Sequence, residues 1–171
     1  MDNTDTQTLE DNLRAIFSQN SIDEARDTIG ALVGTLDAEN QQALNLICSR
    51  LFEEKAKENN TGEYRYTKKE RELYLCAIRC ALSINDRERV YKILDDDRAN
   101  LLMRAYANRS VGPVEMNSPI DIFHDLLASN NKESKFMSNV LEDYFVARGK
   151  DPNDYKQRNY LLFEEVIDDL F

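Results

Sequence analysis

The chain has 171 residues and a formal net charge of −10, with 22 basic and 32 acidic side chains but only five glycines and three prolines. A chain of this length is about one domain and can bury a core without disulfides or metals. The scarcity of glycine and proline argues against disorder and against an all-β fold rich in turns, and the acidity disfavours nonspecific binding to nucleic acid.

The first third of the chain has the periodicity of amphipathic helices. Leu9, Leu13 and Phe17 fall on one face of a first helix. The sequence SIDE at 21–24 is a capping box, in which a serine and a glutamate satisfy first-turn amides, and it predicts the start of a second helix. A third helix is predicted over 37–57. We expect these three helices to form a compact antiparallel group.

The segment LYLCAIRCALSI at 73–84 is apolar around its whole helical circumference, with only Arg79 and Ser83 as exceptions. A helix of this kind is buried on all sides, so we predict that 73–84 is the central helix of the fold. It is shorter than the roughly 20 residues of a membrane-spanning helix. The capping box TKKE at 67–70 precedes it. We expect Arg79 to reach the surface or to pair with a carboxylate, and the alternative is an anion-binding arginine in a cleft.

The second half of the chain continues the helical pattern. The sequence NDRE at 85–88 predicts an N-cap at Asn85. The run DDD at 95–97 lies where the helix dipole favours acidic residues, at the start of the next helix. Three more helices are predicted at 119–129, at about 132–148 with a stop at Gly149, and from 151 onward.

Together these elements predict an all-α domain of about eight or nine helices, with helix pairs packed around 73–84. Residues 1–171 form a single domain in this prediction, and 1–57 and 67–171 are the subdomains if it divides. The stretch AIRCALSINDRERVYKIL at 77–94 resembles the paired helices of an ankyrin unit. No fixed repeat period runs through the chain, so we take the resemblance as support for stacked helix pairs only.

Few residues in the sequence suggest catalysis. Cys48, Cys76 and Cys80 lack disulfide-framework spacing and lie in apolar helical contexts, which predicts reduced, inert thiols and a cytoplasmic location. A zinc site formed by these cysteines and His124 would lack the usual C-x-x-C spacing. The sequence contains no glycine-rich phosphate loop and no G-x-S-x-G or H-E-x-x-H motif. We therefore predict no catalytic, cofactor-binding or metal-binding residue. An enzyme of unfamiliar type, with a cleft around Arg79, is the alternative.

The middle of the chain, from 64 to 109, carries a net positive charge and is rich in tyrosine. Arginine and tyrosine dominate the hot spots of protein interfaces because both combine a large contact area with a polar group. We therefore predict a partner-binding basic face, and the alternative is that this block complements the acidic N-terminal helices internally. The predicted partner-binding residues are Tyr64, Arg65, Tyr66, Arg87, Arg89, Tyr91 and Lys92.

These features predict a non-enzymatic protein–protein interaction module, such as an adaptor, inhibitor or effector, that binds another protein and needs no cofactor. The C-terminal sequence NYLLFEEVIDDLF at 159–171 is expected to dock as the last core helix or to lay its apolar face in a partner's groove. Its paired acids resemble the C-terminal translocation signals of bacterial type IV secreted effectors. The second alternative is therefore a secreted bacterial effector that acts on host proteins in the host cytosol.

Overall fold

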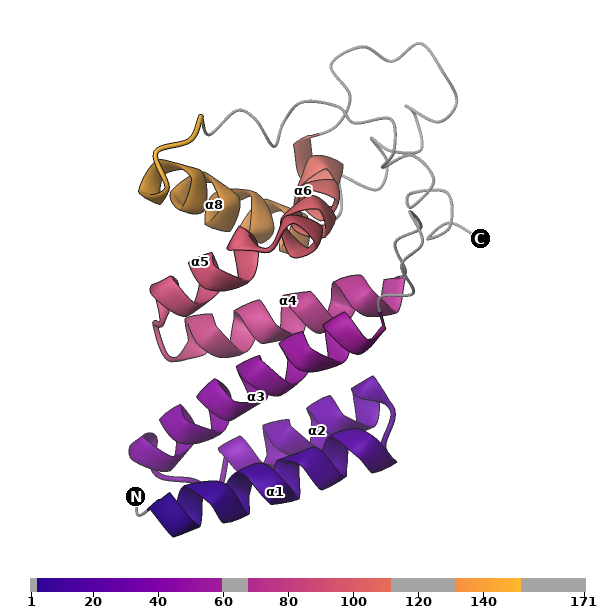
Figure 1. Ribbon diagram of the computed structural model, residues 1–171, viewed down its shortest axis with the longest axis vertical. Helices are drawn as coiled ribbons and strands as arrows, with labels where there is room; N and C mark the ends of the chain where they lie inside the picture. Colours follow the sequence, from indigo (N-terminus) through magenta and orange to yellow (C-terminus); the bar gives the residue numbers. More distant parts are fainter. Residues whose placement is uncertain (1–2, 60–67, 112–131, 152–171) are drawn as a thin grey trace. The chain divides into compact units, whose positions relative to one another are not determined.

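The computed structural model describes residues 3–59, 68–111 and 132–151, and these ranges form seven α-helices and no strand (Figure 1). The all-α prediction is confirmed for this part of the chain. The helices predicted at 119–129 and beyond 151 lie outside the described residues, as does residue 67 of the second capping box. The total number of helices therefore stays a prediction.

The chain divides into two compact units. The first unit comprises Met1–Gly62 and Glu72–Ile93, and the second comprises Glu63–Arg71 and Leu94–Phe171. The chain passes from one unit to the other within helices α4 (Lys68–Ser83) and α5 (Arg87–Asp95). Each unit is described below by itself.

The first unit begins with the three predicted N-terminal helices. These are α1 (Asn3–Gln19), α2 (Ile22–Val33) and α3 (Ala38–Glu58). Helix α1 contacts both α2 and α3, and Figure 1 shows α2 running beside α1. The predicted capping box is confirmed, because the Glu24 amide donates to Ser21 Oγ at 3.3 Å and the Ser21 amide donates to Glu24 Oε2 at 3.0 Å. Asp37 caps α3 in a similar way, by accepting from the Asn40 amide at 2.8 Å.

The predicted apolar stripes of these helices form the core of the first unit. Leu13 and Phe17 of α1 are buried, and the Phe17 ring meets the Phe52 ring of α3 edge to face with centroids 4.6 Å apart. Such an arrangement contributes about 0.5–1.5 kcal/mol beyond the area that it buries. At the surface, Arg14 Nη1 donates to Glu54 Oε2 at 2.9 Å, which joins α1 to α3.

Helix α4 contains the apolar segment of the sequence. Buried residues occur around the circumference of this helix, as predicted, and they include Leu73, Leu75, Ala77 and Ile78. Ser49 of α3 is fully buried, and its hydroxyl donates to the Ala77 carbonyl oxygen at 2.8 Å. No helix in the described residues is long and apolar enough to cross a membrane.

The turn between α4 and α5 differs from the prediction by one residue. Asn85 has a positive φ of 56°, and its amide donates to the Leu82 carbonyl while the Asp86 amide donates to the Ala81 carbonyl. These two bonds form a Schellman motif that ends α4. Asp86, rather than the predicted Asn85, is the N-cap of α5, because its Oδ1 accepts from the Arg89 amide at 3.0 Å. Asparagine tolerates the left-handed conformation that the end of α4 requires.

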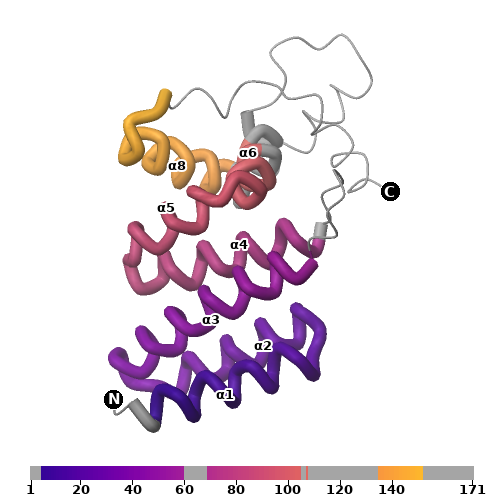
Figure 2. The backbone as a smooth tube through the Cα atoms, in the orientation of Figure 1, coloured from indigo at the N-terminus to yellow at the C-terminus, as the bar shows by residue number. Residues whose placement is uncertain are grey.

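The second unit is built around α6 (Asp97–Val111) and α8 (Lys132–Ala147), which pack against each other (Figure 2). Helix α8 stops where the sequence predicts, because Gly149 has a φ of 66° and its turn forms a second Schellman motif. The fully buried side chains at this contact include Leu102, Met103, Met137 and Leu141.

A buried ion pair within the second unit was not predicted. Glu70 is fully buried, and its carboxylate accepts from both Nε and Nη2 of Arg98, the latter at 2.7 Å. This two-pronged geometry is the strong form of an arginine–carboxylate contact.

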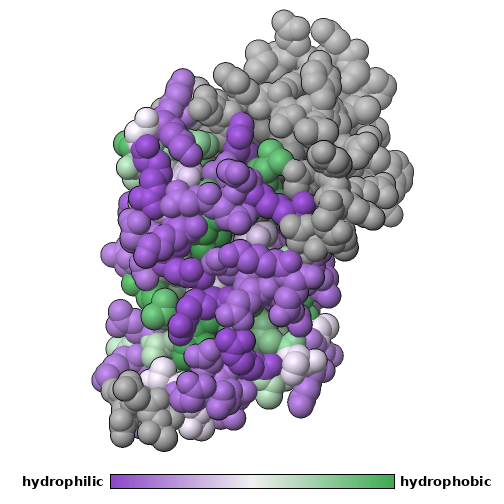
Figure 3. All heavy atoms as spheres, in the orientation of Figure 1, coloured by the Kyte–Doolittle hydropathy of each residue, from purple (hydrophilic) through white to green (hydrophobic). Residues whose placement is uncertain are grey.

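Hydrophilic side chains cover most of the face drawn in Figure 3. The hydrophobic atoms visible there lie in separate places between hydrophilic residues. Among the large hydrophobic residues that the structure describes, the most exposed is Val146, at 64%.

Candidate functional site

The predicted basic face is described only in part. Tyr64, Arg65 and Tyr66 lie outside the described residues. Arg87 and Lys92 are exposed on α5, and Tyr91 is half-buried on the same helix. The opposite side of α5 carries the buried residues Val90, Ile93 and Leu94.

Arg89 does not share this exposed position. Its Nη2 donates to Glu53 Oε2 at 2.7 Å, and its Nε donates to Ser49 Oγ at 3.3 Å. The side chain of Arg89 is 17% exposed and that of Glu53 is 15% exposed. For this residue the contact agrees with the alternative interpretation, in which the basic block complements the acidic N-terminal helices.

Arg79, the arginine of the apolar segment, lines an open cleft in the first unit. The cleft lies across α2, α3 and α4 and has a volume of about 260 Å³. We call it the α2–α4 cleft. Its described lining consists of Arg26, Ile29, Gly30, Val33, Asn45, Phe52, Cys76, Arg79 and Cys80. Apolar side chains thus meet two guanidinium groups from different helices, and this described lining includes no carboxylate.

The thiols of the cleft are poor nucleophiles. Burial raises the pKa of Cys80 to about 12, and it also raises the pKa of Cys76 despite the opposing charges of Arg26 and Arg79. Burial likewise raises the pKa of Cys48. Because the thiolate is the reactive form, these cysteines stay protonated and unreactive near neutral pH, as the sequence predicts.

A metal centre is not assembled within the described residues, where no group of three or more potential ligands comes together. His124, the fourth member of the zinc site considered above, lies outside them.

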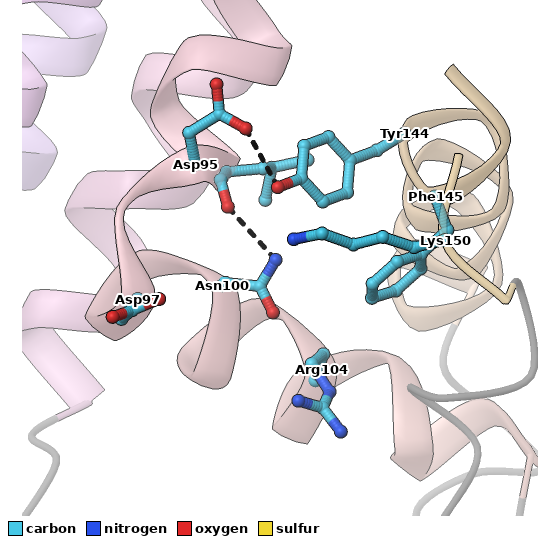
Figure 4. A pocket seen from close by; sticks show the side chains of 8 residues that line it. Asp95, Asp97, Asn100, Arg104, Tyr144, Phe145 and Lys150 are labelled. Carbon is cyan, nitrogen blue, oxygen red and sulfur yellow. Dashed lines mark hydrogen bonds between the residues drawn. The ribbon is translucent and has the colours of Figure 1, made fainter. Parts of the chain in front are cut away.

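A larger polar pocket lies in the second unit and is shown in Figure 4. It has a volume of about 530 Å³ and lies between the start of α6 and the end of α8. We call it the α6–α8 pocket. It is lined by Leu94, Asp95, Asp97, Asn100, Arg104, Tyr144, Phe145 and Lys150.

The three aspartates of the DDD run have different roles at this pocket. Asp96 caps α6 by accepting from the Ala99 amide at 3.0 Å, and Asp97 lies in the first turn of that helix. Asp95 instead accepts from the Tyr144 hydroxyl at 2.9 Å and from Arg148 Nη2 at 3.0 Å. The dipole interpretation therefore holds for Asp96 and Asp97, whereas Asp95 is the last residue of α5 and a tertiary contact.

The Asp95 network sets the protonation of two groups. Hydrogen bonds from Arg148 and Tyr144 lower the pKa of Asp95, so it stays ionised at neutral pH. Burial, with the bond to Asp95, raises the pKa of Tyr144 to about 12. The phenol therefore stays protonated and acts as a fixed donor.

Neither cavity was predicted as a complete site. The cleft joins residues from three helices, and the pocket joins residues about 50 positions apart in sequence, such as Asp95 and Tyr144. The available signals were the solitary Arg79 and the surplus of aspartate at 95–97. Comparisons with protein-family models, with curated proteins and with solved structures find no match.

Proposed function

We propose that this chain is a non-enzymatic protein-interaction module, and that the α2–α4 cleft receives an apolar side chain of a partner protein. The observation that carries this proposal is the lining of the cleft. Ile29, Val33 and Phe52 provide apolar surface, and beside it lie the side chains of Arg79 and of Arg26, whose Nη1 is 3.8 Å from Asp23 Oδ1.

The lining indicates the chemistry of the partner segment. Removing apolar surface from water is the main favourable term in protein association. The cleft therefore suits a segment that presents an apolar side chain, such as an amphipathic helix laid into a groove. A volume of about 260 Å³ is below the range of roughly 300–1,000 Å³ for small-molecule pockets, which favours a side chain over a whole cofactor.

The enzyme alternative receives less support from the same cleft. General acid–base chemistry needs a group that titrates near the working pH. The described lining around Arg79 contains neither a carboxylate nor a histidine, and burial holds Cys76 and Cys80 in the protonated state.

The basic face predicted from the sequence remains part of the proposal as a second contact surface. In this form it consists of Arg87, Tyr91 and Lys92, together with the predicted residues at 64–66, and it excludes Arg89 because that side chain is bound to Glu53. The central position of 73–84 among helix pairs, the cytoplasmic location and the type IV effector alternative also remain proposals.

Gly30 offers a direct test of the cleft. A Cβ atom built on Gly30 meets no heavy atom within 4 Å, so a larger side chain can start there without a clash. We expect Gly30→Phe to fill the cleft and to abolish capture of a partner from cell lysate, with cross-links in the wild type mapping to α2 and α4. Gly30→Ala is the matched control, because it adds a methyl group and leaves the cleft open.

The outcome separates the cleft from the basic face. A partner captured equally by wild type, Gly30→Ala and Gly30→Phe would show that the cleft is not the binding site. In that case the exposed side of α5 becomes the surface to test, with the double substitution Arg87→Glu and Lys92→Glu.

A further inference from the structure

The α6–α8 pocket is lined by one positive and one negative side chain that have no partner within the described part of the chain. Lys150 lies in the turn that ends α8, and Asp97 lies in the first turn of α6. Both residues are exposed. Among the described residues neither side chain forms a hydrogen bond or an ion pair, although Lys150 lies within electrostatic range of Asp95. The pocket therefore offers a ligand one charge of each sign.

The position of Lys150 is fixed by its surroundings. Its backbone amide donates to the Phe145 carbonyl oxygen at 2.7 Å. Its ammonium lies 5.5 Å from the centroid of the Tyr144 ring, within range of a cation–π contact. Figure 4 shows the side chain extending across the pocket toward Asn100 of α6. A lysine whose backbone and ammonium are both held loses less entropy when it binds a ligand.

Asn100 provides a second donor beside this ammonium. Its Nδ2 donates one hydrogen to the Leu94 carbonyl oxygen at 3.0 Å, and this bond fixes the orientation of the amide group. An amide nitrogen carries two hydrogens. The second hydrogen of Nδ2 has no acceptor among the described residues. An anionic oxygen placed between Lys150 and Asn100 can therefore accept from both side chains.

The negative side chain lies close to this donor pair. Asp97 precedes Asn100 by three residues on α6, so the two residues are neighbours on the helix surface and about 4.5 Å apart along its axis. A ligand that contacts both positions must carry its negative and positive groups only a few bonds apart. In an α-amino acid the carboxylate and the ammonium are attached to the same carbon atom, which satisfies this condition.

We propose that the α6–α8 pocket binds a small α-amino acid in its zwitterionic form. The carboxylate of the ligand accepts from Lys150 Nζ and Asn100 Nδ2, and its ammonium donates to the Asp97 carboxylate. The side chain of the ligand is short, because the apolar lining residues Leu94 and Phe145 are almost fully buried and offer little open apolar surface. The volume of about 530 Å³ is within the usual range of small-ligand sites.

The acidity of the chain makes this proposal easy to distinguish from nonspecific attraction. A protein with a net charge of −10 attracts small cations and repels small anions on average, whereas a zwitterion without net charge experiences neither effect. Saturable binding of an amino acid therefore requires a local site. The site is independent of the α2–α4 cleft, because every residue that lines it belongs to the second unit.

The test is an NMR titration of the full chain with three probes at neutral pH. L-Alanine carries both charges, L-alaninamide lacks the carboxylate, and propionate lacks the ammonium. We expect saturable shifts of the backbone amides of Asp97, Asn100 and Lys150 with L-alanine, and binding at least tenfold weaker with each of the other two probes. Shifts that do not saturate with L-alanine, or equal affinity for propionate or L-alaninamide, would overturn the proposal.

Matched variants locate the two charged groups of the ligand. Lys150→Met and Asp97→Asn should each weaken the binding of L-alanine about five- to tenfold, the effect of one charge in a hydrogen bond. Lys150→Met should also remove the preference for L-alanine over L-alaninamide, and Asp97→Asn should remove the preference over propionate. A purely structural role of either residue would leave these preferences unchanged.

Lys135→Met is the control for the lysine variant. It removes an exposed lysine of α8 that does not line the pocket, and it should leave the affinity for L-alanine unchanged. Circular dichroism checks that each variant is folded. Equal affinity for L-alanine in wild type and in a folded Lys150→Met or Asp97→Asn variant would refute the assigned contacts.

Discussion

Arg89 is predicted to stabilise the first unit, and its replacement by alanine tests whether the basic block acts internally. Its guanidinium bonds to Glu53 at 2.7 Å and to the buried Ser49 at 3.3 Å. Arg87, two residues earlier on α5, is exposed and serves as the control. A difference in stability between the two alanine variants therefore measures the internal contact of Arg89.

The magnitude follows from the burial of the pair. A hydrogen bond to a charged group contributes about 1.5–3 kcal/mol, and the side chains of Arg89 and Glu53 are less than a fifth exposed, so solvent screening removes little of it. The full loss of about 3–5 kcal/mol for a broken buried pair is not expected, because Lys57 Nζ remains 2.9 Å from Glu53 Oε1. We expect Arg89→Ala to lower the free energy of unfolding by about 2 kcal/mol.

Urea denaturation followed by circular dichroism measures this loss directly. Arg87→Ala should change the free energy of unfolding by no more than about 0.5 kcal/mol, as is usual for exposed positions. Arg89→Lys keeps the charge but loses the planar fork of donors, so its stability should fall between those of wild type and Arg89→Ala. If Arg89→Ala and Arg87→Ala are equally stable, the contact with Glu53 contributes nothing and the argument fails.

Three further substitutions probe the rest of the molecule. Glu70→Gln should lower the free energy of unfolding by about 3 kcal/mol because it removes the charge of the fully buried carboxylate that Arg98 contacts, and an unchanged free energy in urea denaturation would contradict this. Gly30→Ala should raise the stability of α2 by about 0.5–1 kcal/mol in thermal unfolding, and a lower melting temperature would show that the space around Gly30 is not open. Tyr144 has a pKa of about 12 in the folded chain against 10 for an ordinary tyrosine, so the stability that it contributes is complete below pH 10 and is lost as the pH rises to about 12. Tyr144→Phe should remove this part of the pH dependence, and an unchanged alkaline profile in urea titrations would refute the assignment.

The helices were predictable because their signals are local. The capping box at Ser21, the apolar stripe of α1 and the glycine that ends α8 each act within a few residues. The N-cap of α5 was predicted at Asn85 but lies at Asp86, and this difference has a local cause too. Asn85 and Asp86 are both good N-cap residues, and the choice depends on which of them the preceding helix places in the left-handed conformation.

The cavities and the ion pairs were not predictable in the same way. Glu70 and Arg98 are 28 positions apart, and Arg89 and Glu53 are 36 positions apart. Such pairs depend on how helices are placed in space, and no periodicity within one helix encodes that placement. The sequence shows that a basic block follows an acidic one. This order allows two interpretations, a partner-binding basic face or an internal contact with the acidic N-terminal helices.

The contacts of Arg89 change how the basic block is to be tested. A variant that reverses the charge of Arg87, Arg89 and Lys92 together would break the ion pair with Glu53, so a loss of binding could reflect a loosened first unit. The double substitution Arg87→Glu/Lys92→Glu leaves that pair intact and reverses only the exposed charges. A partner that is lost from the double variant while the free energy of unfolding is unchanged binds the outward side of α5. If binding is lost only when Arg89 is also replaced, it depends on the stability of the first unit. The binding surface is then to be sought at the α2–α4 cleft.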